Sequence, residues 1–147
     1  MCRKLQSNDN CSKVVGIDGS IEMITKAKQK GGEFHLAKLP EWAPSQKFDL
    51  IHSMEFLYYL KDPLEMLKIF FNEWLNDKGV LIAGVDHYLE NVESHDWPES
   101  LNVHMTTLSE EQWRQGMVDA GFTDVETRRV GLKLGFVGTL AISGRKP

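Results

Sequence analysis

The sequence has only two cysteines among its 147 residues, Cys2 and Cys11, and its first ten residues lack the apolar core of a secretion signal. Because disulfide frameworks are typical of secreted domains, we expect both cysteines to be reduced thiols in a cytoplasmic protein. No apolar run approaches the roughly 20 residues that span a bilayer. Basic runs are also lacking and the net charge is −4, so composition favours neither nucleic acid nor an anionic membrane as a partner.

Low-complexity tracts, internal repeats and linkers are lacking as well. Apolar residues make up 41% of the chain and charged residues 26%, which suits a single packed core. The length predicts one domain over residues 1–147. No pair of histidines, cysteines or acids has the spacing of metal ligands, so we expect no metal site.

The most informative stretch that is present is K-V-V-G-I-D-G-S, residues 13–20. Three apolar residues end at Asp18, and I-E-M-I-T-K-A-K-Q-K then follows with helical spacing. This pattern predicts a buried strand over 13–18, a tight turn, and a helix over 20–30 with Ser20 as its N-cap. A carboxylate at the tip of a parallel strand can accept two hydrogen bonds from a vicinal diol. The simpler role for Asp18 is to cap the helix that follows.

Strands and helices alternate along the rest of the chain. Asp62, Pro63 and Glu65 are a typical helix start, and Ser109 with Gln112 is another. We expect helices from these points to about residues 75 and 120, a short helix within 54–60, and strands over 33–37, 48–53, 79–86, 122–130 and 134–143. The last two strands should pair antiparallel. Residues 87–108 show no sustained period, and we interpret them as a loop of the kind that is usually functional or mobile.

Four pieces of the sequence, taken in order, resemble one family. They are V-V-G-I-D-G-S-I-E-M-I-T-K-A, L-P-E-W-A-P-S-Q-K-F-D-L-I-H-S-M-E-F-L-Y-Y-L-K-D-P, L-N-D-K-G-V-L-I-A and L-S-E-E-Q-W-R-Q-G-M-V-D-A-G-F-T-D-V-E. Their order and spacing resemble those of class I S-adenosylmethionine-dependent methyltransferases of the small-molecule type. The resemblance implies an α/β fold with a Rossmann-like sheet, parallel except for an antiparallel C-terminal strand.

The same resemblance implies S-adenosylmethionine, or its product S-adenosylhomocysteine, as the cofactor. Asp18 would hold the ribose, with Gly19, Ser20 and Ile21 passing under the adenosine. Ser53 and Met54 would line the methionine end. The family's adenine-binding acid is missing from H-L-A-K, residues 35–38, so contact there would use the backbone or His35, beside Leu36.

The implied reaction is methyl transfer to an oxygen or nitrogen of a small molecule. Candidate substrate contacts are Glu55, Tyr58, His87 and Trp97, and no catalytic residue is assigned. Each has a plainer reading: Ser53 can be an N-cap, the aromatic run over 56–59 can be core, and His87 can be a solvated loop histidine.

One departure from the family is that no Gly-rich loop precedes Lys13. Residues 1–8 resemble the tail of the helix that would follow such a loop. We therefore expect an N-terminally truncated chain that lacks the first strand. Two other functions stay open: a non-catalytic methyltransferase-like remnant that binds a partner, and a nicotinamide-binding Rossmann domain. Exposed strand edges would favour a homodimer.

Overall fold

The computed structural model describes residues 11–147, so the helix tail expected over residues 1–8 lies outside the described part. The chain divides into two compact units, with the boundary between Ala43 and Pro44. Among the described residues, no helix combines the length and the apolar character needed to cross a membrane.

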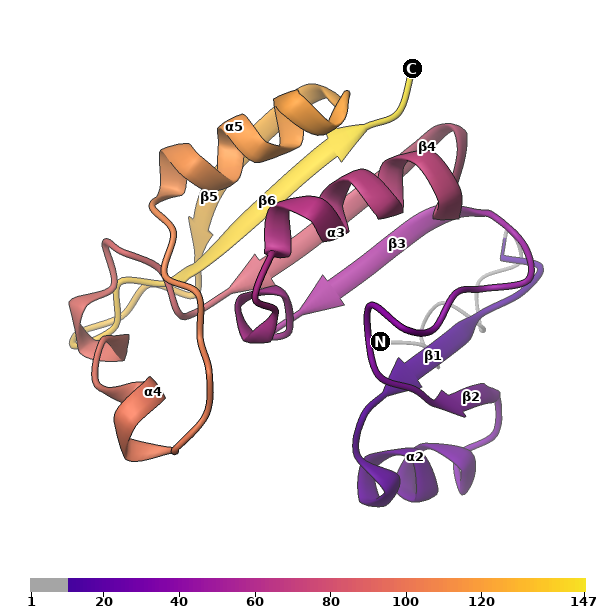
Figure 1. The fold of residues 1–147 in the computed structure, drawn as a ribbon, viewed down its shortest axis with the longest axis horizontal. Helices are drawn as coiled ribbons and strands as arrows, with labels where there is room; N and C mark the ends of the chain where they lie inside the picture. Colours follow the sequence, from indigo (N-terminus) through magenta and orange to yellow (C-terminus); the bar gives the residue numbers. More distant parts are fainter. Residues whose placement is uncertain (1–10) are drawn as a thin grey trace. The chain divides into compact units, whose positions relative to one another are not determined.

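The first unit is one strand–helix–strand motif (Figure 1). It consists of β1 (Val15–Asp18), α2 (Ile21–Lys28) and β2 (Glu33–Leu36), and the two strands pair in parallel. The Ser20 side chain caps α2 by accepting a hydrogen bond from the Met23 backbone N–H. The three elements expected from the sequence are therefore confirmed, with ends that differ by at most two residues, but β1 is half-buried and not buried as expected.

The second unit contains a four-stranded sheet in the order β3–β4–β6–β5 (Figure 1). β3 (Phe48–Met54) runs parallel to β4 (Leu75–Val85), whereas β6 (Thr139–Arg145) is antiparallel to both β4 and β5 (Thr123–Val130). This arrangement confirms the Rossmann-like sheet with an antiparallel C-terminal strand. It also places the carboxyl ends of β3 and β4 at the same edge of the sheet.

One face of this sheet carries the helices α3 (Pro63–Ile69) and α5 (Glu110–Ala120). Period-two alternation turns Leu81, Ala83 and Val85 of β4 toward that face, and all three are buried. A β-carbon on Gly144 of β6 would meet the Met117 side chain of α5, so helix and strand pack closely. Trp113 and Met117 are fully buried and belong to the inner face of α5.

The sequence predicted a helix to about residue 75 and a strand from residue 79, but no turn separates the two elements. Helix α3 continues as the π-helical turn η2 (Phe70–Trp74), and β4 begins at Leu75 instead of Gly79. Leu75 already pairs with Phe48 of β3, and the ladder resumes at Leu50 and Val80. The polar residues between are an irregularity inside the strand, where Lys78 adopts a φ of 65°.

Three further expectations needed correction or refinement. β6 begins at Thr139 and not at Leu134, because residues 131–138 form the connecting turn. The apolar run after β3 gives only one 3-10 turn, η1 (Leu57–Tyr59). The stretch over 87–108 contains η3 (Val92–Ser94) and α4 (Trp97–Ser100), so it is more ordered than a plain loop.

The start of α5 offers a direct test of this unit's stability. The Ser109 Oγ accepts a hydrogen bond from the Gln112 N–H at 3.1 Å, and the Gln112 Oε1 accepts one from the Ser109 N–H at 2.8 Å. Ser109→Ala removes one of these bonds and should lower the free energy of unfolding by about 1 kcal/mol. Urea denaturation measures this loss, and Ser45→Ala in an exposed loop is the control. Equal stability of the two variants would contradict the capping role.

Candidate active site

The carboxyl end of β1 gathers most of the residues expected to bind the cofactor in the first unit. Asp18 lies opposite Leu36 in the strand register, and its carbonyl accepts a hydrogen bond from the Ala37 N–H at 3.0 Å. The exposed Asp18 carboxylate accepts a hydrogen bond from the Ser20 N–H through Oδ1 at 2.7 Å. This bond fixes the direction of the carboxylate at the tip of the strand, where a ligand hydroxyl can reach it.

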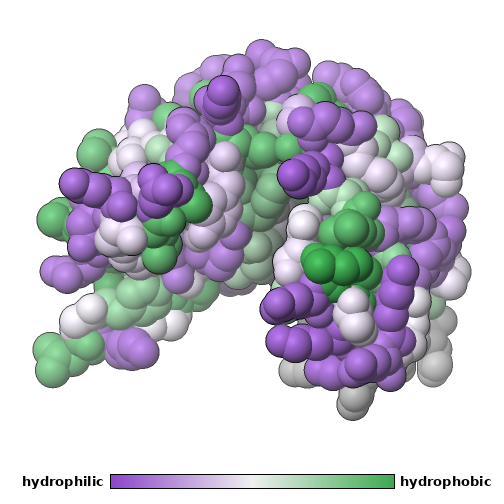
Figure 2. All heavy atoms as spheres, turned by 60° about the horizontal axis from the view of Figure 1, so that its bottom comes forward, coloured by the Kyte–Doolittle hydropathy of each residue, from purple (hydrophilic) through white to green (hydrophobic). Residues whose placement is uncertain are grey.

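Apolar side chains lie exposed beside this carboxylate. Ile21 is 60% exposed and Leu36 is 54% exposed, and with Met23 they are the large exposed apolar residues of the described first unit. Figure 2 shows apolar atoms gathered in the foreground on the right, over this unit. Ile21 therefore lies on the outer surface of this unit. An exposed apolar surface beside an oriented carboxylate suits a nucleoside, which is flat and apolar on its base and hydroxylated on its sugar.

His35 does not point to the same side as Asp18. Paired residues of parallel strands share a face and neighbours alternate, so Asp18 and Leu36 share one face and His35 occupies the other. The His35 Nε2 lies 3.0 Å from the Glu33 Oε1, and its ring lies 5.8 Å from that of Trp42. Hydrogen bonds from His35 and Lys13 hold the pKa of Glu33 below its usual range. Of the two expected adenine contacts, the register thus favours the backbone near Leu36 over the His35 ring.

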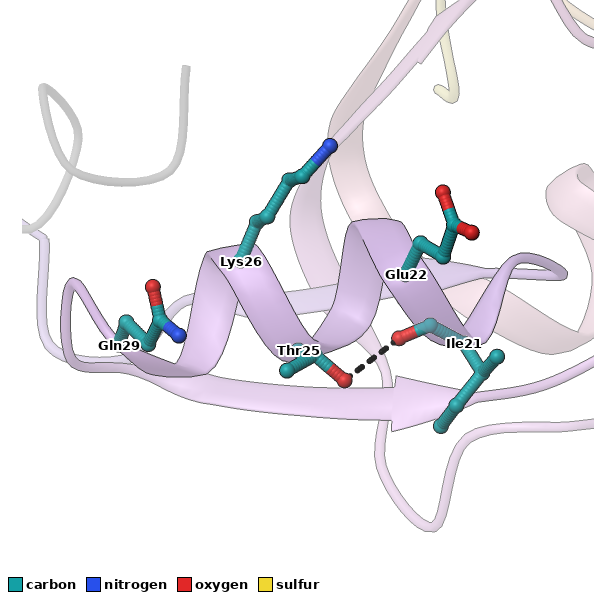
Figure 3. A pocket seen from close by; sticks show the side chains of 5 residues that line it. All are labelled: Ile21, Glu22, Thr25, Lys26 and Gln29. Atoms are coloured by element: carbon teal, nitrogen blue, oxygen red, sulfur yellow. Dashed lines mark hydrogen bonds between the residues drawn. The ribbon is translucent and has the colours of Figure 1, made fainter.

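A shallow, open hollow also lies along α2, but its chemistry differs. It is lined by Ile21, Glu22, Thr25, Lys26 and Gln29 (Figure 3). Thr25 uses its hydroxyl within the helix, donating to the Ile21 carbonyl at 2.7 Å. The long side chains of Glu22 and Lys26 extend away from the helix and do not converge on a point (Figure 3). We assign no function to this hollow.

In the second unit, the candidate site lies at the carboxyl ends of β3 and β4. Ser53 and Met54 are paired with Ala83 and Gly84 of β4, and a β-carbon on Gly84 would collide with the Met54 side chain. Gly84 therefore leaves the space in which Met54 lies. Both residues expected at the methionine end of the cofactor stand at this edge of the sheet, and Met54 is 43% exposed.

Glu55 joins the ends of the two strands. Its N–H donates to the Gly84 carbonyl at 2.9 Å, while its Oε2 accepts hydrogen bonds from the Tyr58 hydroxyl at 3.0 Å and the Asp86 N–H at 3.3 Å. Glu55 adopts a φ of 52°, a conformation that residues other than glycine rarely adopt. Strain of this kind is retained where the surrounding contacts hold it, and it is common at functional sites.

Two carboxylate oxygens at this point are buried without a hydrogen-bond partner among the described residues. They are Oε1 of Glu55 and Oδ1 of Asp86. Burial, and then the negative charge of Asp86, raise the pKa of Glu55 to about 7. A carboxyl group with such a pKa can accept or release a proton near neutral pH. Asp86 was recognisable in the sequence only as an acid that ends an apolar strand, as Asp18 does.

The four residues expected to contact the substrate form a connected row. From Glu55, the row continues through the Tyr58 hydroxyl; the Tyr58 ring lies 5.7 Å from His87, and the His87 ring lies 6.3 Å from Trp97. Burial and the neighbouring Glu55 raise the pKa of Tyr58, so its hydroxyl stays protonated and donates to that carboxylate. The structure therefore brings together residues that lie up to 42 positions apart in sequence.

His87 itself is not the solvated histidine that the sequence suggested. It is fully buried, its Nδ1 lies 3.0 Å from the Ser94 carbonyl, and its Nε2 lies 2.7 Å from the Thr107 hydroxyl. Burial lowers the pKa of His87, which favours a neutral ring that donates at Nδ1 and accepts at Nε2. With both nitrogens engaged, His87 ties residues 94 and 107 to the end of β4. These hydrogen bonds leave neither ring nitrogen free for a ligand, so a direct substrate contact by His87 stays a prediction that they do not support.

Comparisons with known proteins agree with this fold. A family model described as a methyltransferase domain matches residues 1–127, and the chain belongs to this family. A search of curated proteins finds no matching sequence.

Solved structures give three informative likenesses. A methyltransferase from Haloferax volcanii, solved in a complex with the Trm112 methyltransferase activator, is 26% identical with a TM-score of 0.83, over 99% of this chain and 76% of that one. A Mesorhizobium loti S-adenosylmethionine-dependent methyltransferase is 18% identical with a TM-score of 0.75, over 92% and 81%. The N-methyltransferase NodS of Bradyrhizobium japonicum, bound to S-adenosylhomocysteine, is 18% identical with a TM-score of 0.68, over 98% and 71%.

The raised pKa of Glu55 predicts a pH dependence of stability. Because folding raises this pKa from 4.5 to about 7, its contribution is complete below pH 4.5 and is lost as the pH rises through about 7. Glu55→Gln removes this titration. The free energy of unfolding of Glu55→Gln minus that of wild type should therefore be about 1 kcal/mol more positive, that is, more stabilising, at about pH 8 than at about pH 5.

Urea denaturation at the two pH values measures the difference. Glu99→Gln, at an exposed position in α4, is the matched control and should show the wild-type pH dependence. A Glu55→Gln variant with the wild-type pH profile would show that Glu55 titrates at its ordinary pKa.

Proposed function

We propose that this chain transfers a methyl group from S-adenosylmethionine to an oxygen or nitrogen of a small molecule. The arrangement of Glu55 and Asp86 at the ends of two parallel strands is the observation that carries this proposal. The pKa of Glu55, raised to about 7, and its position at the carboxyl ends of two parallel strands support the proposal, because open α/β sheets bind ligands outside these ends. Membership of the methyltransferase family supports the reaction type.

Each unit, taken by itself, carries residues suited to one part of the cofactor. On the first unit, the side chain of Asp18 and the segment Gly19, Ser20 and Ile21 suit the nucleoside, with His35 and Leu36 at the end of β2. On the second, Ser53 and Met54 suit the methionine end. The oriented Asp18 carboxylate and the exposed apolar side chains beside it fit such a ligand. The sulfonium of a bound cofactor makes its methyl group electrophilic.

The remaining work falls to the residues around Glu55. An acceptor hydroxyl or ammonium must lose a proton, and the Glu55 carboxylate is the group in this unit suited to take it. The Tyr58 hydroxyl, which donates to Glu55, keeps the carboxylate oriented, and the Trp97 ring offers an apolar or cation-binding surface. Asp86 keeps the Glu55 pKa high through its charge.

Binding of S-adenosylhomocysteine to the 147-residue chain tests the cofactor assignment. Isothermal titration calorimetry should detect binding, and Asp18→Ala should weaken it by about 1–3 kcal/mol, because hydrogen bonds to a charged group are lost. Glu41→Ala, at an exposed position of the same unit, is the control. Failure of the wild-type chain to bind would favour the non-catalytic interpretation, and full affinity of Asp18→Ala would leave Asp18 with only its role in the turn before α2.

We also propose that the chain associates with protein. β3 forms the end of its four-stranded sheet in the described part of the chain, and its backbone edge offers hydrogen bonds to a further strand. A homodimer through such an edge is one arrangement, and a protein activator of the kind solved with the Haloferax volcanii neighbour is another. Light scattering after gel filtration distinguishes them: a dimer of the chain alone supports the first, and a mixed complex formed only with a Trm112 protein supports the second. A monomer under both conditions would overturn this proposal.

A further inference from the structure

The connection between β5 and β6 projects as an apolar turn. It spans residues 131–138, with positive φ at Gly131 and Gly135 and a bridge between Lys133 and Phe136. The Leu134 side chain is fully exposed and Leu132 is 64% exposed. The Leu134 side chain buries nothing within its own unit, so folding alone does not explain an apolar residue at this tip.

The charge around this turn differs from that of the whole chain. No acid follows Glu126 in this part of the chain, whereas Arg128, Arg129 and Lys133 do; Arg145 and Lys146 stand at the opposite end of β6 and do not contribute here. Arg129 pairs with Glu110 at 3.4 Å, but Arg128 and Lys133 lie exposed on and beside the turn. A net charge of −4 therefore hides a segment in which exposed leucines and exposed cations stand together.

We propose that residues 131–138 dock on the surface of an anionic lipid bilayer. Leucine side chains gain by entering the boundary between headgroups and acyl chains, and nearby lysine and arginine are attracted to anionic headgroups. Lysine suits this position because its stem stays in apolar surroundings while its ammonium reaches the headgroups. The Lys133 Nζ already lies 5.9 Å above the Phe136 ring.

The shape of the turn favours a bilayer over a protein groove as the occupant. Leu134 stands at the tip and its cations lie on the flanks, so a flat, fluid, anionic surface satisfies both at once. The neighbouring segment over 89–101 carries Glu90, Glu93, Asp96 and Glu99. Because these acids would be repelled by an anionic surface, the segment over 89–101 would stay away from it. The contact is then limited to the turn and its flanks.

The docked chain would have a defined orientation. Leu140, just after the turn, pairs with Val85 at the end of β4, and the Tyr88 hydroxyl donates to the Gly138 carbonyl at 2.8 Å. The turn therefore leaves the sheet at the carboxyl end of β4, where the candidate site lies. Docking would direct this end of the sheet toward the lipid. The inference does not depend on methyl transfer.

Co-sedimentation with vesicles tests the proposal. The 147-residue chain should bind vesicles of phosphatidylcholine mixed with phosphatidylserine, and bind vesicles of phosphatidylcholine alone at least about tenfold more weakly. Leu134→Ser should weaken binding to the mixed vesicles roughly tenfold, because the buried apolar surface is lost. Lys133→Glu should weaken it at least as much and reduce its dependence on salt.

Matched controls use the same changes elsewhere on the second unit. Leu101→Ser, at a residue 58% exposed, and Lys61→Glu, at an exposed residue, should bind as wild type does. Thermal unfolding monitored by circular dichroism confirms that each variant is folded. S-adenosylhomocysteine binding is measured separately without vesicles, so that a failure of the cofactor assignment can be distinguished from a failure of lipid binding. No binding of the wild-type chain, equal binding to both vesicle types, or equal losses in the controls would each overturn the proposal.

Discussion

The carboxylate of Glu55 holds together the ends of two parallel strands that arrive from distant parts of the sequence. Its Oε2 accepts one hydrogen bond from the backbone of the residue after β4 and one from the Tyr58 hydroxyl. The backbone N–H of the same residue donates to β4, so main chain and side chain act at one point. The positive φ of Glu55 is retained because these contacts fix it, and the row of residues toward Trp97 begins at this junction.

Local signals in the sequence predicted most of the fold. The helix starts at Ser20, Asp62 and Ser109 were all confirmed, because a side-chain cap acts within three residues and needs no information about tertiary structure. The antiparallel pair at the C-terminal end was likewise confirmed. The start of β4 was wrong, since Leu75 belongs to a helical stripe in the sequence but finds Phe48 as a strand partner in the structure. That choice depends on a contact between residues far apart in the chain.

The sequence suggested candidate site residues one by one, but not their arrangement as a chemical unit. An acid at a strand end suggested Asp18, yet the coupling between Asp86 and Glu55 follows from the register of β3 against β4, which no local pattern shows. The burial of His87 was missed for a similar reason. A histidine in an aperiodic polar segment looks solvated until its partners Ser94 and Thr107, 7 and 20 residues away, are known. Net charge also concealed the basic segment after Glu126, because averages remove the information about position.

The hydrogen bonds around residues 87–108 determine which part of this segment is free to rearrange. His87 anchors Ser94 and Thr107, the Leu89 N–H donates to the Leu108 carbonyl, and the Thr106 N–H donates to the Tyr58 carbonyl. Both ends of the segment are thus fastened to the sheet and to η1. Any hinge must lie between residues 95 and 105, so an opening motion would swing α4 and Trp97 while the base of the segment stays in place.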